Sequence, residues 1–420
     1  MPAISKDADP PVSAAGPPNE ETATARATYR QVWAHREFRA LWAAQVLSVA
    51  GDQLARVALT VLVYDRTGSA LLAAVTFVAS LVPEFIGGVL LAGLADRWPR
   101  RELMVACDLA RAALVAVMVV PGVPVAVLVV LLFAVTLVGA PFTAGRAALY
   151  ADILAGDLYV LGTAVTFTTA QAAQVVGFGA GGVLVGLLGV RPSLAADAAT
   201  FVLSSALILA WVRHRPAAAG ESRTRGFSMA GVRLVFGAAG LRIPMLLGWL
   251  AAFTDVYEGV AVPLARDMGG GAAAAGLILA SGALGASAGS VAFGRLVRPE
   301  TRIRWMAPLA AAACAALGLF ALQPGLAGAL LILTASGALC CYQLAANAAF
   351  VTATPPDRRG EAFGVAQGGI TLGQGTVMIL AGAAATWLPP AIVIAVAGGL
   401  GTVAALVIAS GSRRPQLVSP

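Results

Sequence analysis

Twelve long apolar runs dominate the chain and restrict what it can fold into. Each run is long enough to cross a hydrocarbon core of about 30 Å as an α-helix. Hydrophobic residues make up 59% of the 420 residues and charged residues only 12%, whereas a soluble protein carries about a quarter charged residues. Lipid must therefore be the solvent for much of the surface. The runs lie near residues 40–64, 70–94, 103–121, 124–146, 160–189, 192–212, 243–265, 272–296, 304–322, 325–350, 362–387 and 389–410.

These runs are continuous and do not alternate, which predicts an all-α membrane protein with twelve transmembrane helices and not a β-barrel. If the N-terminus is cytoplasmic, only Arg66, Arg191 and Arg266 lie in loops on the opposite side, and Arg56 and Arg111 fall inside helices. The other basic residues gather in cytoplasmic segments, as the positive-inside rule requires. We therefore expect both termini in the cytoplasm and a multi-pass protein of the inner membrane. The net charge of +7 follows from this asymmetry and does not indicate a nucleic-acid partner.

The longest internal polar segment, 213–242, divides the runs into six and six. Matching features recur at a nearly constant offset in the two halves, which predicts two pseudo-symmetric six-helix bundles in a parallel arrangement. Asp52 matches Asp255, and Gly93, Arg97 and Arg101 match Gly294, Arg298 and Arg302. The predicted organisation is a disordered cytoplasmic tail (1–36), an N-terminal bundle (37–212), a cytoplasmic linker (213–242) with a short helix near 228–240, a C-terminal bundle (243–411) and a cytoplasmic tail (412–420).

Ionisable side chains inside a membrane span are costly, so they are candidates for function. Asp52 lies in the middle of the first run, and Arg56 follows at i+4, where the two can neutralise each other. Asp255 holds the equivalent position in the seventh run, with Glu258 at i+3 and no arginine beside it. Two carboxylates on one face in a low dielectric favour proton binding and release. Glu84 in the second run is a further candidate. A structural ion pair, with Arg56 reaching an acid of the seventh helix, remains an alternative.

Four other charged residues are interpreted as structural. Asp108 and Arg111, at i and i+3 in the third run, are expected to support the loop that precedes them. Arg146, at the inner end of the fourth run, is expected to contact a loop or a lipid headgroup. Asp197, which follows Pro192, is expected to cap the sixth helix at its outer end.

Polar but uncharged side chains in the spans are candidates for lining a central cavity. A few amide and phenol groups among apolar neighbours would suit an amphipathic small-molecule substrate. The same groups can also bridge helices without touching a ligand, and this alternative remains open. The candidates are Gln45, Gln53, Gln171, Gln174, Tyr257, Tyr342, Gln343 and Asn347, with Gln367 and Gln374 on the eleventh run.

The segment GLADRWPRR, from Gly93 to Arg101, resembles the cytoplasmic signature G-x-L-a-D-R-x-G-R-R of the major facilitator superfamily, although Pro99 replaces a glycine. The segments FRALWAAQVLSVAGDQLARVAL and DRRGEAFGVAQGGITLGQG resemble one branch of it, the drug:proton antiporters that include macrolide-efflux and enterobactin-exporter-like proteins. Gly177, Gly181 and Gly182 also match the helix 5 motif G-P-x-x-G-G of antiporters, with Phe178 in place of the proline.

The resemblance implies a major facilitator fold and proton-coupled efflux of an amphipathic small molecule, such as a drug, siderophore or secondary metabolite, by alternating access. It also implies a gating role for the signature loop. Asp96 would dock on the cytoplasmic end of the eleventh helix, with Arg97 and Arg101 completing a charge network, and Gly93 would begin the loop. The alternative is that the arginines anchor the loop to anionic lipid.

Other function classes are less compatible with the sequence. The single lysine, Lys6, excludes a P-loop lysine, and the two histidines, His35 and His214, lie far apart. We expect no enzymatic activity, no cofactor and no metal, and a protein that functions as a monomer in contact with protons and the lipid bilayer. An uncoupled facilitator or importer, for example of a lysolipid, and a membrane binding protein without transport activity are the alternatives.

Overall fold

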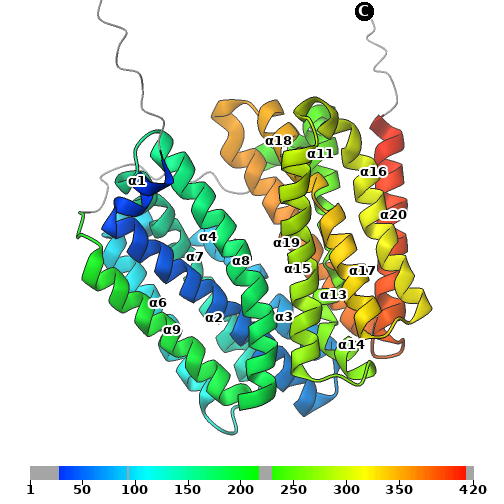
Figure 1. The fold of residues 1–420 in the computed structure, drawn as a ribbon, viewed down its shortest axis with the longest axis horizontal. Coiled ribbons are helices and arrows are strands. Elements are labelled where there is room, and N and C mark those ends of the chain that lie inside the picture. Colours follow the sequence, from blue (N-terminus) through cyan, green and yellow to red (C-terminus); the bar gives the residue numbers. More distant parts are fainter. Residues whose placement is uncertain (1–27, 92–93, 217–228, 413–420) are drawn as a thin grey trace, which may run out of the picture.

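The computed structural model describes residues 28–91, 94–216 and 229–412, and these residues form helices joined by turns and short loops. The helices gather in two groups that stand side by side (Figure 1). The described chain begins at α1 and ends at α20 on the same side of the molecule, at the top of Figure 1. We call this the terminal side and the opposite one the distal side.

The first group holds the N-terminal half of the chain. Its helices are α1 (Tyr29–Ala34), α2 (Arg36–Thr67), α3 (Ala70–Val78), α4 (Val82–Leu90), α5 (Leu94–Arg97), α6 (Arg100–Val119), α7 (Val125–Ile153), α8 (Asp157–Leu188) and α9 (Val190–Trp211).

The second group holds the C-terminal half. Its elements are α10 (Met229–Gly237), α11 (Ala239–Trp249), α12 (Ala251–Thr254), α13 (Val256–Gly259), α14 (Ala261–Asp267), α15 (Ala272–Leu296), α16 (Pro299–Leu317), the 3₁₀ helix η1 (Gly318–Leu322), α17 (Leu326–Leu339), α18 (Tyr342–Ala353), the 3₁₀ helix η2 (Pro356–Arg358), α19 (Arg359–Ala384) and α20 (Pro390–Ser412). The short helix expected near 228–240 is present as α10.

Local sequence explains several boundaries. Gly68 ends α2 in the left-handed conformation (φ 63°), and its N–H donates to the carbonyl of Tyr64 at 2.8 Å, as at many helix ends. The Ser69 side chain then accepts from the N–H of Leu72 and caps α3. The second run is divided into α3 and α4, with Pro83 in the first turn of α4, where its missing N–H has no helical partner to lose.

Ten helices of the described residues are long and apolar enough to cross a membrane, by length and composition. Two further long helices, α6 and α19, are not among these ten. Asp108 and Arg111 lie within α6, close behind Glu102, and glutamines and glycines make α19 more polar. The runs 103–121 and 362–387 are therefore helical, but their membrane crossing is not confirmed, and twelve spans stay a prediction.

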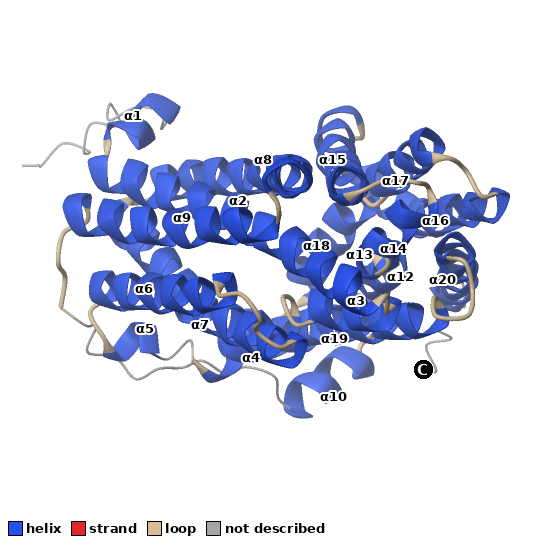
Figure 2. Cartoon of the chain, turned by 90° about the horizontal axis from the view of Figure 1, so that it is seen from below, coloured by secondary structure: helices blue, strands red, loops and turns tan. Residues whose placement is uncertain are grey.

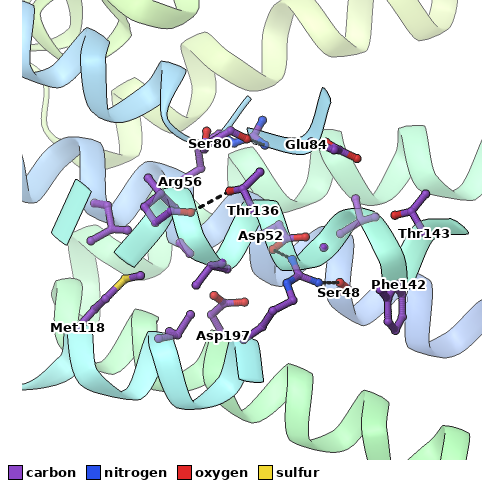
Figure 3. Close-up of a pocket in the computed structure, with 18 of the residues that line it drawn as sticks. Ser48, Asp52, Arg56, Ser80, Glu84, Met118, Thr136, Phe142, Thr143 and Asp197 are labelled. Carbon is purple, nitrogen blue, oxygen red and sulfur yellow. Dashed lines mark hydrogen bonds and ion pairs between the residues drawn. The ribbon is translucent and has the colours of Figure 1, made fainter. Parts of the chain in front are cut away.

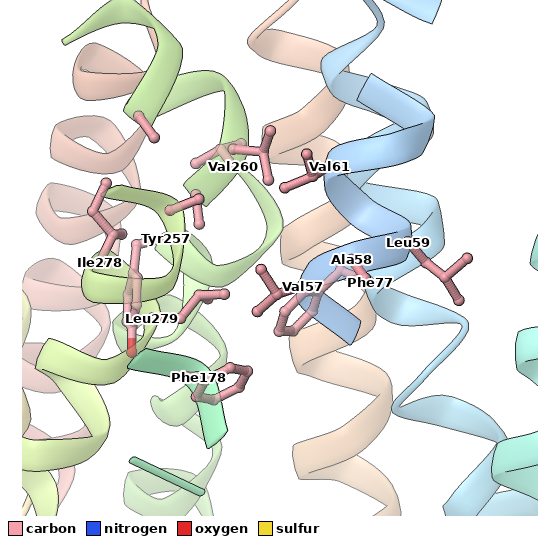
Figure 4. Packing of buried hydrophobic residues seen from close by; sticks show 14 of the residues in the cluster. Val57, Ala58, Leu59, Val61, Phe77, Phe178, Tyr257, Val260, Ile278 and Leu279 are labelled. Carbon is pink, nitrogen blue, oxygen red and sulfur yellow. The ribbon is translucent and has the colours of Figure 1, made fainter. Parts of the chain in front are cut away.

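The two halves share one cluster of buried apolar side chains (Figure 4). Val57 and Val61 of α2 and Phe77 of α3 lie in it together with Val260 and Leu279 of the other half. The same cluster includes Val185 near the end of α8, Leu264 of α14 and Ala272 at the start of α15, which lie towards the distal side. The other three clusters of buried residues in the described chain belong to one half each. The apolar core therefore joins the halves on the distal side.

Small residues allow this junction to be tight. A Cβ on Gly182 of α8 would meet the carbonyl oxygen of Ala272 at 2.6 Å and the Cα of Gly276 on α15 at 2.7 Å. Gly382 of α19 packs in the same way against Ala74 of α3. Viewed from the distal side, α8 lies beside α15, and α3 lies near α19 (Figure 2). Close approach of this kind is typical of helices that associate in lipid.

Candidate functional site

The N-terminal half encloses a cavity of about 140 Å³ lined by charged and polar side chains (Figure 3). Helices α2, α4, α6, α7 and α9 surround it. A cavity of this size holds several water molecules if it is polar. Its polar lining consists of Ser48, Asp52, Arg56, Ser80, Glu84, Arg111, Thr136, Thr143, Arg146 and Asp197.

Asp52 is paired with Arg111 and not with Arg56. The Nη2 atom of Arg111 donates to Oδ1 of Asp52 at 2.6 Å, and its Nη1 atom donates to Oγ of Ser48 at 3.1 Å. The guanidinium is 4.1 Å from the centre of the Phe201 ring. The i+4 spacing of Asp52 and Arg56 permits a pair, but α2 and α6 both pack against α9, and the long side chain of Arg111 reaches Asp52 from α6. The expected self-neutralising pair is therefore wrong.

Arg56 points elsewhere. Its Nη2 atom donates to the carbonyl of Ser80, between α3 and α4, at 3.1 Å, and its guanidinium lies 5.5 Å from the Phe77 ring centre. It forms no ion pair with an acid of the described chain, although its charge acts on Glu258 across the junction of the halves. The alternative ion pair between Arg56 and an acid of the seventh predicted helix is therefore not formed in the described residues.

Asp108 and Asp197 are fully buried. Oδ2 of Asp108 accepts from the Ser204 hydroxyl at 2.5 Å, and its Oδ1 lies 3.9 Å from Arg111. Asp197 belongs to the middle of α9 and not to its cap, which is Gly189. The expectation that Asp197 caps the helix is wrong, because α9 begins before Pro192. The hydrogen bonds and ion pairs of Asp108 and Arg111 in the described residues connect α6 to α2 and α9 and do not reach the loop before α6.

Glu84 and Arg146 line the same cavity from α4 and α7. Glu84 is exposed, and Arg146 is half-buried with its guanidinium 5.8 Å from the Phe142 ring centre. The expectation that Arg146 contacts a loop or a headgroup is therefore wrong. Arg146 lies within α7 and faces the cavity inside the bundle.

The acidic pair of the C-terminal half lies where the helix is interrupted. Asp255 separates α12 from α13, and Glu258 is in the single turn of α13. The Gln374 amide donates to Oδ2 of Asp255 at 2.7 Å, and the Thr254 hydroxyl donates to Oδ1 at 3.3 Å. Both acids are half-buried. Within the described chain, neither one has an ion-pair partner.

The structure divides the cavity candidates into two groups. Gln45 accepts from the Tyr150 hydroxyl at 3.3 Å inside the N-terminal half, and the Tyr342 hydroxyl donates to the carbonyl of Leu247 at 3.2 Å. These two residues and the buried Gln53 and Tyr257 lie in packed interiors. The others are half-buried or exposed: Gln171, Gln174, Gln343, Asn347, Gln367 and Gln374.

The predicted gating loop is only partly visible. Gly93 and the side chain of Asp96 lie outside the described residues, so the docking of Asp96 stays a prediction. Arg97 ends α5 and is exposed. Arg101 donates to the carbonyl of Leu209 near the end of α9 at 2.6 Å. Its contact satisfies one of the free carbonyls of that helix end.

The described residues contain no cluster of three or more His, Cys, Asp or Glu side chains that could hold a metal ion. The four cysteines are free thiols. Several functional contacts were not anticipated from the sequence. Ser48, Ser204 and Thr200 belong to the polar network, and the spacing i, i+3, i+7 of Asp197, Thr200 and Ser204 on one helix face was the available signal.

Solved structures with the same fold are transporters. A POT family transporter in complex with 5-aminolevulinic acid has a TM-score of 0.72 at 12% identity, covering 92% of this chain and 97% of that one. The nucleoside transporter NupG has a TM-score of 0.70 at 14% identity, covering 89% and 99%. A bacterial homologue of the human lysosomal transporter Spinster, in an inward-facing and occupied conformation, has a TM-score of 0.67 at 16% identity, covering 90% and 96%. At these identities the likeness concerns the fold.

No curated protein matches the chain. The family model of the Major Facilitator Superfamily matches it twice, over residues 41–344 and 259–419, which together span most of the chain. Both bundles of helices and the junction between them fall inside the matched region. The chain therefore belongs to the Major Facilitator Superfamily, as a multi-pass membrane protein of transmembrane transport.

Proposed function

We propose that the protein is a secondary active transporter of the inner membrane that exports an amphipathic small molecule in exchange for protons. The observation that carries the proposal is the acidic pair Asp255 and Glu258, which has no ion-pair partner in the described chain. Two adjacent negative charges repel strongly in a medium of low dielectric. Binding of one proton relieves this repulsion, so the pair is suited to take up and release a proton.

The internal repeat supports this choice of site. Asp52 is the counterpart of Asp255, and its charge is neutralised by Arg111. At offsets of 201 to 203 residues, Arg111 corresponds to Ala312, Ala313 or Cys314 in the second half, and none of these residues is a cation. Asp255 accepts only neutral donors, Gln374 and Thr254. In this conformation Asp52 of the N-terminal half is paired with a cation, whereas Asp255 and Glu258 of the C-terminal half have no cationic partner in the described residues.

Conformation supports alternating access. The halves pack closely on the distal side and have separate apolar cores towards the terminal side. With the termini in the cytoplasm, this arrangement is an inward-facing state. Rocking of the two halves would open the distal side and close the terminal one, with α6 and α19 as the third and eleventh of twelve spans.

The substrate is proposed from the remaining polar candidates. Gln171, Gln174, Gln343 and Asn347 keep exposed surface, whereas Gln45 and Tyr342 are used in packing. Scattered amides among apolar side chains suit a ligand that is largely apolar. The export direction and the drug or siderophore class come from the resemblance to drug:proton antiporters.

The gating loop completes the proposal. A carboxylate from Asp96 at the N-terminal end of α19 would meet free N–H groups and the positive end of the helix dipole. This contact would stabilise the state that is closed on the terminal side. If Asp96→Asn transports as the wild type does, the loop has no such role.

The test is substrate efflux in inverted vesicles and proteoliposomes, with a panel of lipophilic drugs and siderophores. Wild type is compared with Asp255→Asn, Glu258→Gln and Asp52→Asn. Asp267→Asn is the matched control, because Asp267 is an exposed acid at the end of α14, in the same segment. Coupling between proton and substrate of about 1–3 kcal/mol corresponds to a change of about 5–150-fold in substrate affinity between acidic and alkaline pH.

We expect flux that collapses with the pH gradient, and loss of the pH effect on affinity in Glu258→Gln or Asp255→Asn but not in Asp267→Asn. Flux that is independent of the gradient and unchanged in each acid variant would instead indicate an uncoupled facilitator. Binding of a ligand without flux in any variant would indicate a membrane binding protein.

A further inference from the structure

Three carboxylates surround one guanidinium in the N-terminal half. Arg111 is paired with Asp52 at 2.6 Å and lies 3.9 Å from Asp108, and its charge also acts on Asp197. Asp108 and Asp197 are each 0% exposed, and Arg111 is 4% exposed. This buried cluster therefore contains more acids than bases.

Asp197 has the weakest partners of the three acids. Its Oδ1 atom is 3.5 Å from the Thr200 hydroxyl, which already donates to the Asp197 carbonyl at 2.7 Å. Its Oδ2 atom is buried and has no hydrogen-bond partner. Gly51 of α2 leaves just enough room for this carboxyl group, because a Cβ at that position would collide with it. The side chain nevertheless lines the same cavity as Asp52 (Figure 3).

In the described residues no cation lies within ion-pair distance of Asp197. From α2 it faces Asp52, and from α6 it faces Arg111, whose Nε is also buried without a partner. Arg146 of α7 and Glu84 of α4 line the cavity and form no ion pair within the described chain. Arg56 donates to the Ser80 carbonyl. An ionised Asp197 would thus be a buried charge without compensation, which costs several kcal/mol.

We propose that Asp197 holds a proton in this conformation and that Arg111 changes its ion-pair partner from Asp52 to Asp197 during the transport cycle. This step rests on the proposed function as a proton-coupled transporter. A proton from water in the cavity binds a carboxylate oxygen of Asp52, and its ion pair with Arg111 weakens. The proton on Asp197 passes to water in the cavity, and the new carboxylate pairs with Arg111. One proton enters and one leaves, so the charge of the cluster is conserved.

Through this exchange Asp52 can bind a proton, although in this conformation its charge is neutralised by Arg111. It also links protonation to the position of α9 relative to α2 and α6, because Arg111 would be bonded to a different helix. Asp197 is thereby a second proton-carrying residue, separate from the pair Asp255 and Glu258.

The test is infrared difference spectroscopy of the purified full chain in lipid, without substrate, over a pH titration. Protonated carboxyl groups give a C=O band apart from that of carboxylates. We expect the wild type to show a band that Asp197→Asn lacks and that Asp267→Asn, an exposed acid at the end of α14, retains. Thr200→Val keeps the carboxyl group and removes its hydroxyl neighbour, and it should move the pH at which the band disappears. Asp52→Asn should move it as well, because Arg111 then loses its first partner.

A wild-type band that persists in Asp197→Asn, and whose titration Thr200→Val and Asp52→Asn leave unchanged, overturns the proposal. If Asp197→Asn does not fold, the last two variants decide. Because the measurement needs no substrate, it is independent of flux. If the expected band is present but efflux is not driven by protons, the proposed function alone is refuted. If efflux is coupled to protons but the band is missing, the exchange alone is refuted.

Discussion

The Nη2 atom of Arg266, in the last turn of α14, lies 2.6 Å from Oδ1 of Asp65, near the end of α2, so an ion pair joins the two halves on the distal side. The side chains are 39% and 45% exposed, and such pairs contribute only about 0.2–1 kcal/mol. The pair therefore stabilises the contact between the two halves only weakly.

Asp65→Asn should shift the protein towards the state that is open on the distal side, by a factor of up to about five in population. The measurement is the distance distribution between spin labels on the distal ends of α3 and α14. Added salt should reduce the difference between variant and wild type, because exposed charges are screened. Asp267→Asn is the control, and an equal shift in that variant would count against the pair.

Gly182→Ala should hinder closure of the distal side far more than Gly186→Ala. A Cβ on Gly182 meets backbone atoms of α15 at 2.6 and 2.7 Å, whereas a Cβ on Gly186 first meets Ala273 at 3.8 Å, an ordinary contact. Overpacking of this kind costs about 1–3 kcal/mol. Labelling of single cysteines at the distal end of α8 should accelerate in Gly182→Ala and stay at the reference rate in Gly186→Ala. Equal rates in both variants would refute the tight contact.

Arg111→Gln should destabilise the N-terminal half by about 3–5 kcal/mol, because the fully buried Asp108 and the half-buried Asp52 lose their cation. Thermal unfolding in detergent measures the effect. Arg191→Gln, at the exposed start of α9, is the matched control and should leave the midpoint nearly unchanged. If the unfolding midpoint of Arg111→Gln lies near that of Arg191→Gln, Asp52 and Asp108 are already protonated and uncharged.

The contact between Glu102 and His214 should depend on pH. Oε1 of Glu102, which precedes the run 103–121, lies 2.7 Å from Nδ1 of His214. Burial raises the pKa of Glu102, but the hydrogen bond with His214, a backbone hydrogen bond and the charges of His214 and Arg101 lower it more, so the net pKa lies below its usual range. A lowered carboxyl pKa contributes stability above the ordinary pKa, and this contribution is lost as the pH falls through the lowered value.

Hydrogen exchange of residues 212–216 tests this expectation. Protection should decrease in acid in the wild type and should be low at all pH values in Glu102→Gln. Glu300→Gln, which changes the first-turn acid of α16, should behave like the wild type. The effect should be small, since the Glu102 side chain is 42% exposed.

The apolar runs predicted the helices well because run length and the scarcity of charge depend only on local sequence. The breaks inside them were harder to predict. The run 243–265 is divided at Leu250, Asp255 and Val260. Gly259 and Pro263 lie close to the last of these breaks, but no glycine or proline lies beside Asp255. Tertiary packing against α19 and the bond from Gln374 stabilise this conformation, and neither can be deduced from spacing alone.

Pairing of charges was predicted from helix periodicity, which describes neighbours on one helix and not those on another. Periodicity therefore suggested Arg56 for Asp52, whereas the packing of α6 supplied Arg111. Asp197 was misjudged for a similar reason, because its position near Pro192 suggested a helix end. The polar stripe of Asp197, Thr200 and Ser204 would have indicated a buried network.

The close approach of Gly182 to α15 has a mechanical consequence. Helix α8 crosses its neighbour near one end, so the crossing divides it into unequal lever arms. At about 1.5 Å per residue, the arm from Gly182 to Leu188 measures about 9 Å and the arm back to Asp157 about 38 Å. If the helix tilts about this crossing as a rigid rod, its far end travels about four times as far as its near end. A displacement of Leu188, at the near end, no larger than a water molecule would then move the other end of α8 by the width of a small ligand.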